Sequence, residues 1–203
     1  MIKQTTTPAA LPVDRILNTA TELFYMQGYR ATGINEIIKR SGVAKATFYS
    51  YFPGKDVLGI AYLKGKSASV LHYFENAIDN AEGSLKRFLA IIASLEPWLI
   101  ETNFRGCAFL NIASEVPDYN SPLRKPGIKI YTAIHQRVTT LCEELINSNT
   151  HKYNDLNATD LSKEYMLILV GAVTLSELYN DISPARDALE AACHLIGETP
   201  ENI

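Results

Sequence analysis

Two short helical segments separated by a three-residue turn constrain this chain more than any other feature. Residues 34–40, INEIIKR, place three isoleucines on one face of a helix, and residues 44–51, AKATFYSY, form a second segment of similar length. The turn between them contains Gly42, which can adopt the left-handed backbone conformation of a tight turn. Two helices this short and this closely joined are typical of a helix-turn-helix unit.

The rest of the chain is also expected to be helical, because no pair of segments alternates with the period of two typical of strands. Residues 12–27 carry apolar side chains at helical spacing and precede Gly28, a suitable C-terminal cap. Thr32 is a candidate N-cap for the next helix. A fourth helix is predicted from Lys55 to about Leu71. Loop signals at residues 80–83, 103–106, 117–126, 147–160 and 181–184 predict four or five longer helices, the last two at 161–180 and 184–197.

The second short segment carries small residues where a helix that only fills a core would carry Leu and Ile. In a helix-turn-helix the second helix lies in the DNA major groove, with its first residues nearest the base edges. This geometry places Lys45, Ala46 and Thr47 at the bases, and Ser50 lies one turn further on. The segment is therefore predicted to be the recognition helix.

The aromatic residues of this segment divide between two faces. Phe48 and Phe52 are four residues apart and are expected in the core, so Tyr49 and Tyr51 point outward, where their hydroxyls can donate to phosphate oxygens. Lys55 stands at a helix N-terminus and is also expected at a phosphate. On spacing alone, a small helical bundle with exposed tyrosines is the alternative.

The charge of the chain is unevenly distributed. Residues 1–66 carry nine Lys or Arg against four Asp or Glu, whereas residues 67–203 carry ten against eighteen, and the net charge is −3. A basic N-terminal part on an acidic remainder favours nucleic-acid contact by the N-terminal part alone.

Residues 16–63 resemble the DNA-binding domain of the tetracycline-repressor (TetR) family of transcriptional regulators. The matching residues occur in order and without gaps: Ala20, Leu23, Phe24, Gly28, Tyr29, Ala31, Thr32, Ile37, Gly42, Val43, Thr47, Phe48, Tyr49, Phe52, Lys55 and Leu58. The resemblance implies an all-α homodimer whose three-helix head binds a palindromic operator and whose C-terminal body binds a small inducer. The DNA-binding positions it carries over are Thr32, Lys45, Thr47, Tyr49, Tyr51 and Lys55. Ala44 departs from the many members that cap this helix with Ser or Thr.

Three parts of the chain are therefore expected. They are a flexible arm at residues 1–10, a DNA-binding domain at 11–63, and a regulatory domain for ligand binding and dimerisation at 64–203. In the resembled family the last two helices of each subunit form the dimer interface, and here Gly171 and the alanines of residues 184–197 would let helices approach closely. Ordinary packing within one chain is the alternative.

The effector pocket is predicted from residues 105–131, which resemble a segment of one broad subset of the family, with Gly106, Cys107, Asn111 and Glu115 as recurring points. We expect Asn111 and Glu115, four residues apart, to be hydrogen-bonded to each other and to anchor a ligand in an apolar cavity. The candidate effector-binding residues are Trp98, Phe104, Cys107, Asn111, Glu115, Tyr131, His135 and Tyr165, with Phe88 as a further wall. Core packing is the alternative for the aromatic members.

Catalytic and metal-binding patterns are missing from the sequence: it has no CxxC or HExxH spacing, no paired acids and no nucleophile–base pair. We therefore expect no enzyme activity, no cofactor and no metal. Three cysteines without paired spacing indicate reduced thiols in a cytoplasm, and a redox role for Cys107 stays open. The longest apolar run, residues 165–175, is too short to cross a membrane.

Together these patterns predict a cytoplasmic, ligand-responsive transcriptional regulator. The leading hypothesis is a homodimeric repressor that a small, largely apolar effector releases from a palindromic DNA operator. The alternative is an activator or an inducer-independent DNA-binding protein.

Overall fold

The computed structural model describes residues 10–199 and contains helices but no strand in that range. The expected arm at residues 1–10 lies outside the described residues except for Ala10. The helices are α1 (Pro12–Gln27), α2 (Ile34–Ser41), α3 (Lys45–Tyr51), α4 (Lys55–Asp79), α5 (Gly83–Ala93), α6 (Leu95–Glu101), α7 (Ala108–Glu115), α8 (Lys125–Ser148), α9 (Ala158–Tyr179) and α10 (Ser183–Leu195), with a 3-10 turn η1 (Pro122–Arg124) before α8. The all-α prediction is confirmed.

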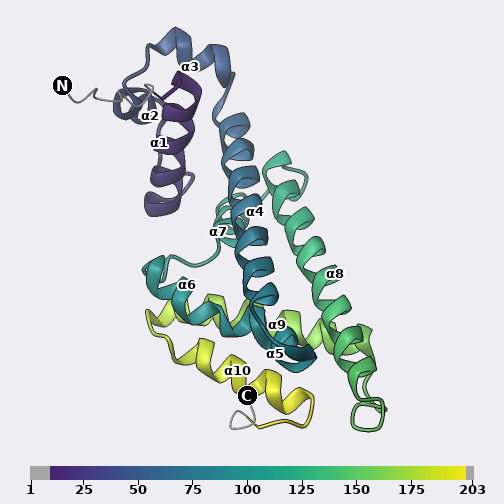
Figure 1. Ribbon diagram of the computed structural model, residues 1–203. Helices are drawn as coiled ribbons and strands as arrows, with labels where there is room; N and C mark the ends of the chain where they lie inside the picture. Colours follow the sequence, from purple (N-terminus) through teal and green to yellow (C-terminus); the bar gives the residue numbers. More distant parts are fainter. Residues whose placement is uncertain (1–9, 200–203) are drawn as a thin grey trace, which may run out of the picture.

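Helices α1, α2 and α3 form a head at one end of the molecule, and α4 leads from this head into a body made of the remaining helices (Figure 1). α1 begins at Pro12, where the missing N–H costs no helical hydrogen bond, and ends before Gly28. α2 ends at Gly42, whose φ of 65° and ψ of 30° are left-handed. Both glycine positions agree with the sequence prediction.

The prediction that Thr32 caps α2 is wrong. The N-cap is Gly33, and no side chain donates or accepts a capping bond there. Thr32 is fully buried, and its hydroxyl donates to the Gly28 carbonyl at 2.8 Å. Its hydroxyl therefore closes the turn between α1 and α2.

Helix α4 is longer than predicted, because it continues past Leu71 to Asp79. The polar residues in its middle weaken the apolar pattern, but Phe74 packs against the core and Ile78 is completely buried in it. One continuous helix of 25 residues therefore joins the head to the far side of the body.

The body differs from the prediction in how its helices are divided. Residues 83–101 form two helices rather than one, because Pro97 has no N–H to donate to the Ala93 carbonyl and the helix breaks at Ser94. α8 begins at Lys125, with Pro126 in its first turn, instead of after a loop that ends at Pro126. Six α-helices therefore follow α4 in the described part, instead of four or five. The last two lie within three residues of their predicted bounds.

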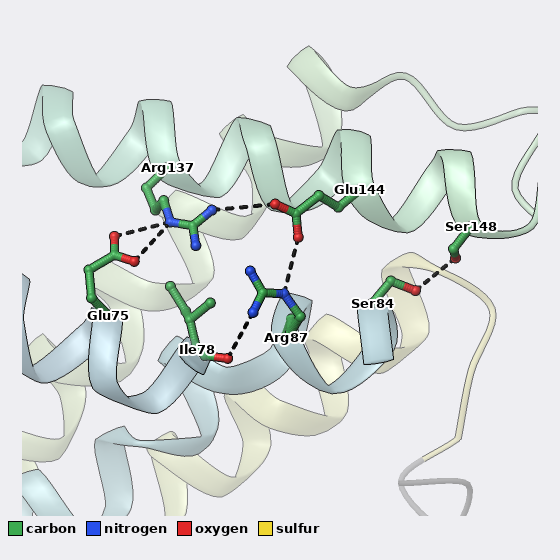
Figure 2. Close-up of polar contacts among 7 residues, drawn as sticks. All are labelled: Glu75, Ile78, Ser84, Arg87, Arg137, Glu144 and Ser148. Carbon is green, nitrogen blue, oxygen red and sulfur yellow. Dashed lines mark hydrogen bonds and ion pairs between the residues drawn. The ribbon is translucent and has the colours of Figure 1, made fainter. Parts of the chain in front are cut away.

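A polar network joins the far end of α4 to α5 and α8 (Figure 2). The Arg137 guanidinium donates to both Glu75 oxygens at 3.0 and 3.1 Å and lies 3.6 Å from Glu144. Arg87 donates to the other Glu144 oxygen at 3.2 Å and to the Ile78 carbonyl at 3.3 Å. Two arginines and two carboxylates thus hold three helices together where α4 ends.

Helix α9 is covered on one side only. Leu169 and Val173 are buried against the rest of the body, whereas Leu167 and Leu178 are 76% and 70% exposed. An uncovered apolar face remains along α9.

Candidate DNA-binding surface and effector pocket

The second helix of the head, α3, presents two different faces. Phe48 is completely buried and Phe52 nearly so, whereas Tyr49 and Tyr51 are 40% and 46% exposed. The ring of Tyr49 stands edge-on to the ring of Phe48 at a centroid distance of 5.3 Å. The division of the aromatic residues predicted from the sequence is confirmed, and the two tyrosines lie on the outer surface of the head.

The first residues of α3 also face solvent. Lys45, Ala46 and Ser50 are exposed, and Thr47 is half-buried. The Ser50 hydroxyl donates to the Thr47 carbonyl at 2.7 Å, so its oxygen remains available as an acceptor. Ala44 is the N-cap and provides no side-chain bond. The structure thus brings four of the predicted base-facing residues onto one exposed helix.

The two remaining predicted DNA-binding residues lie differently. The Lys55 ammonium donates to the Arg30 carbonyl at 3.3 Å and lies 4.6 Å from the centre of the Tyr29 ring. Burial lowers the pKa of Lys55. Thr32 is buried, which argues against a side-chain contact with DNA. Both residues hold the loop between α1 and α2 in this structure.

The body contains a cavity of about 240 Å³ between α4, α6, α7, α8 and α9. Aromatic and aliphatic side chains form most of its walls. The residues that line it are Tyr25, Lys66, Ser69, Val70, Tyr73, Phe74, Leu95, Trp98, Glu101, Thr102, Gly106, Cys107, Ala108, Phe109, Ile130, Tyr131, Ile134, Leu169, Val170 and Val173. An apolar cavity with a few polar groups is typical of a small-molecule site.

Three of the eight predicted effector residues, Trp98, Cys107 and Tyr131, line this cavity. The Cys107 thiol lies 3.3 Å from the Tyr131 hydroxyl, and burial raises the pKa of both groups. A raised pKa leaves little thiolate, so the surroundings of Cys107 do not favour a redox role.

Five predicted effector residues do not line the cavity. Tyr165 is completely buried, stacks edge-on with Phe88 and accepts a hydrogen bond from the Ile92 amide at 3.3 Å. His135 lies 3.1 Å from the Ser162 hydroxyl. For Tyr165 and for Phe104, which packs against the core, the core-packing alternative agrees with the structure.

The prediction that Asn111 and Glu115 bond to each other is wrong. The Asn111 amide donates to the Arg105 carbonyl at 3.0 Å and to Glu177 at 3.5 Å. The Glu115 carboxylate instead accepts from the backbone N–H of Tyr29 at 3.1 Å and that of Arg30 at 2.5 Å. Both residues therefore make contacts between elements, and Glu115 joins α7 to the head.

A second set of bonds joins the head to the body beside the cavity. The Arg105 guanidinium donates twice to the Tyr25 carbonyl, at 3.0 and 3.2 Å, and so satisfies an acceptor in the last turn of α1. The Tyr25 hydroxyl donates to the Gly106 carbonyl at 3.2 Å. Because Tyr25 and Gly106 also line the cavity, the cavity wall includes part of the head–body contact.

Sequence reasoning missed Tyr25 and Lys66, which reach the cavity from α1 and α4. Tyr25 follows the buried residue Phe24 in the predicted first helix, and nothing in its sequence surroundings indicates a contact with the body. Lys66 is an isolated charge in a polar stretch. The one sequence feature that could have indicated Lys66 is its basic side chain in the middle of the predicted fourth helix.

The part of the chain that the structure describes contains no group of three His, Cys, Asp or Glu side chains that could hold a metal ion. Within residues 10–199, no helix has both the length and the apolar character needed to cross a bilayer.

Family comparisons match both parts of the chain. The profile described as bacterial regulatory proteins, tetR family, matches residues 16–62. The profile described as tetracyclin repressor-like, C-terminal domain, matches residues 84–192, which is more than half of the chain.

Two curated relatives come from Bacillus subtilis. The chain is 42% identical over 126 residues to the HTH-type transcriptional regulator LmrA, covering 58% of this chain and 64% of LmrA. It is 32% identical over 120 residues to the uncharacterized HTH-type transcriptional regulator YxaF, covering 58% and 63%. The chain thus spans slightly less than two thirds of the length of these relatives.

Solved structures share the fold over nearly the whole chain. SCO4454, a TetR-family transcriptional regulator from Streptomyces coelicolor, superimposes with a TM-score of 0.82 at 25% identity, covering 92% of this chain and 94% of that one. A regulatory protein TetR from Rhodobacter sphaeroides has a TM-score of 0.77 at 20% identity, covering 90% and 97%.

Proposed function

This chain belongs to the tetR family of bacterial regulatory proteins, and we propose that it is a homodimeric repressor that a small, largely apolar effector releases from a palindromic operator. In this proposal residues 11–63 are the DNA-binding head, and residues 64–203 are the regulatory and dimerisation body. Helix α4 crosses the boundary between them.

The observation that carries the proposal is the outer face of α3. Lys45 reaches guanine acceptors, Thr47 bonds base edges or contacts a thymine methyl, and the small Ala46 permits close approach. Tyr49 and Tyr51 donate their hydroxyls to phosphates on either side. The buried Phe48 supports this arrangement because it fixes α3 in the core of the head.

A ligand response is supported by the cavity in the body. One wall of the cavity is Tyr25, a residue of the head, so a ligand there touches both parts of the molecule. Release from DNA then needs a coupling free energy of only about 1–3 kcal/mol between the two sites. The same cavity argues against the alternative of an inducer-independent protein, which needs no such space.

Dimerisation is supported by the uncovered face of α9. Leu167, Leu175 and Leu178 lie at helical spacing on that face and are 76%, 41% and 70% exposed. A two-fold axis beside α9 and α10 would bury this face against its copy. It would also present two α3 helices to half-sites about one DNA turn apart.

Fluorescence anisotropy tests the proposal, using the duplex upstream of the protein's own gene and a scrambled duplex at two salt concentrations. We expect Lys45→Ala to lower the affinity for the specific duplex by about 10- to 100-fold, since a base contact is worth about 1–3 kcal/mol. Tyr49→Phe should weaken binding to both duplexes by removing a phosphate contact. Lys86→Ala and Tyr119→Phe, which change exposed residues of the body, are the matched controls.

Equal, strongly salt-dependent binding to both duplexes would contradict the operator proposal, because it indicates backbone contacts alone. A reporter gene fused to the same upstream region separates repressor from activator. Loss of the protein raises expression if it represses and lowers expression if it activates.

A further inference from the structure

We propose that the cavity takes a small organic acid with an apolar body, whose anionic group pairs with the Lys66 ammonium. This inference rests on the proposed function, since it names the class of effector that the regulatory cavity binds.

The argument begins with the charges at the cavity wall. Lys66 is the one basic residue among the described residues that line it, and Glu101 is the one acidic residue. Within residues 10–199, the Lys66 ammonium makes neither an ion pair nor a hydrogen bond, and it lies 4.3 Å from the centre of the Tyr25 ring. Burial lowers the pKa of Lys66, with no compensating contribution from a carboxylate. A half-buried positive charge is therefore left without an acceptor.

The hydroxyl groups around the cavity are already engaged in the protein. Tyr25 donates to the Gly106 carbonyl at 3.2 Å, and Tyr73 donates to the Ser94 carbonyl at 2.8 Å. Thr102 donates to a carbonyl of its own helix at 2.8 Å, and the Tyr131 hydroxyl pairs with Cys107. Among the described wall residues, the Lys66 ammonium is thus the one charged donor without an acceptor. A hydrogen-bond acceptor on a ligand is therefore stabilised most when it lies beside this ammonium.

The ligand must be anionic at one end and apolar elsewhere. A carboxylate at Lys66 gains a charge-assisted hydrogen bond, which is about twice as strong as a bond between neutral groups. The other walls come from side chains such as Trp98, Phe109, Ile134 and Val173, which favour burial of hydrocarbon. A cavity of about 150 Å³ holds benzene, so about 240 Å³ suits a molecule with one ring or a short chain.

The position of Lys66 also connects the ligand to the head. An acid group at the ammonium lies beside Tyr25, whose carbonyl and hydroxyl both bond to the α6–α7 loop. Drawing the ammonium away from the Tyr25 ring therefore perturbs a contact between head and body. Through this contact, binding of the acid changes the affinity of the head for the operator.

Binding can be measured without DNA, because Trp98 is the only tryptophan of the chain and lines the cavity. The probes are 3-phenylpropanoate and octanoate, each compared with its uncharged amide by tryptophan fluorescence of the full chain. We expect at least one acid to bind about tenfold or more tightly than its amide, since a hydrogen bond to a charged group contributes about 1.5–3 kcal/mol.

The variant Lys66→Met should remove this preference and leave amide binding unchanged, whereas Lys66→Arg should retain it. Lys64→Met, which changes an exposed lysine two residues earlier on the same helix, is the control. Circular dichroism of each variant checks folding. Equal binding of acid and amide, a preference that survives Lys66→Met in a folded protein, or no binding of either acid overturns the inference.

Operator release, measured by anisotropy with the same four probes, separates the two proposals. An acid that binds through Lys66 without releasing DNA leaves the ligand class standing and refutes release by this ligand. Release by the amides but not by the acids supports the repressor and refutes the anionic effector.

Discussion

Glu115 offers the sharpest test of how the head is attached to the body. Its carboxylate accepts the backbone N–H groups of Tyr29 and Arg30, and these bonds cross from α7 to the loop after α1. The variant Glu115→Ala removes both acceptors without adding bulk. Glu115→Gln keeps one acceptor oxygen and replaces the other with a donor that faces an N–H group.

The expected loss follows from the exposure of the two donors. Arg30 is exposed, so water replaces the carboxylate at its amide with little cost, whereas Tyr29 is only 5% exposed. A hydrogen bond to a charged group contributes about 1.5–3 kcal/mol. We therefore expect Glu115→Ala to lower the free energy of unfolding by about 2 kcal/mol, and Glu115→Gln by about half of that. For a chain of this length, 2 kcal/mol corresponds to about 4–8 °C in melting temperature.

Two measurements test this expectation at one fixed protein concentration, since the proposed dimerisation would make stability depend on concentration. Urea unfolding gives the global change, and hydrogen exchange reports the amides of Tyr29 and Arg30 directly. Glu143→Ala, a change at an exposed carboxylate on α8, is the control and should stay within about 0.5 kcal/mol of wild type. Unchanged stability together with unchanged exchange at both amides in Glu115→Ala would refute the reasoning.

Three further predictions concern the core, the interface and the pH dependence. Phe48→Ala, at a completely buried ring, should cost about 3–5 kcal/mol in urea unfolding; a loss below 1 kcal/mol would contradict its core role. Leu178→Glu should shift the protein to monomers in sedimentation experiments, and an intact dimer would exclude this face. Burial raises the pKa of the Glu177 carboxyl above its ordinary value of 4.5. The protonated side chain therefore stabilises the fold below pH 4.5, and this contribution is lost as the pH rises through the raised pKa. The melting temperature of Glu177→Gln should rise relative to that of wild type as the pH increases across that window. Parallel profiles of melting temperature against pH would exclude this assignment.

The head was predictable because its structure depends on neighbours in the sequence. The spacing of Phe48 and Phe52 determines which face of α3 is buried, and Gly42 marks a turn that needs a left-handed residue. Both signals lie within a few residues of their effect. Two side chains depart from the pattern: the hydroxyl of Thr32 bonds inward rather than capping α2, and the Lys55 ammonium bonds to the Arg30 carbonyl.

The cavity was less predictable because it depends on contacts between distant segments. Glu115 bonds to residues 85 and 86 positions earlier, and Asn111 bonds to Glu177, 66 positions later. Spacing within one helix indicated instead that Asn111 and Glu115 pair with each other. Nothing local marks Tyr25 as a cavity residue, since its role arises from where α1 lies against the body.

The polar network at the far end of α4 fixes that end of the helix to α5 and α8. Glu75 is fixed by Arg137, whereas Lys55 lies twenty residues away in the head. At 1.5 Å per residue these two positions are about 30 Å apart along the helix. A tilt of about 5° at this network therefore moves the head by about 3 Å, close to the 3.4 Å rise of one base along a DNA strand. Under the proposed ligand response, a small tilt of α4 at this network would therefore displace the head by about the spacing at which a DNA sequence is read.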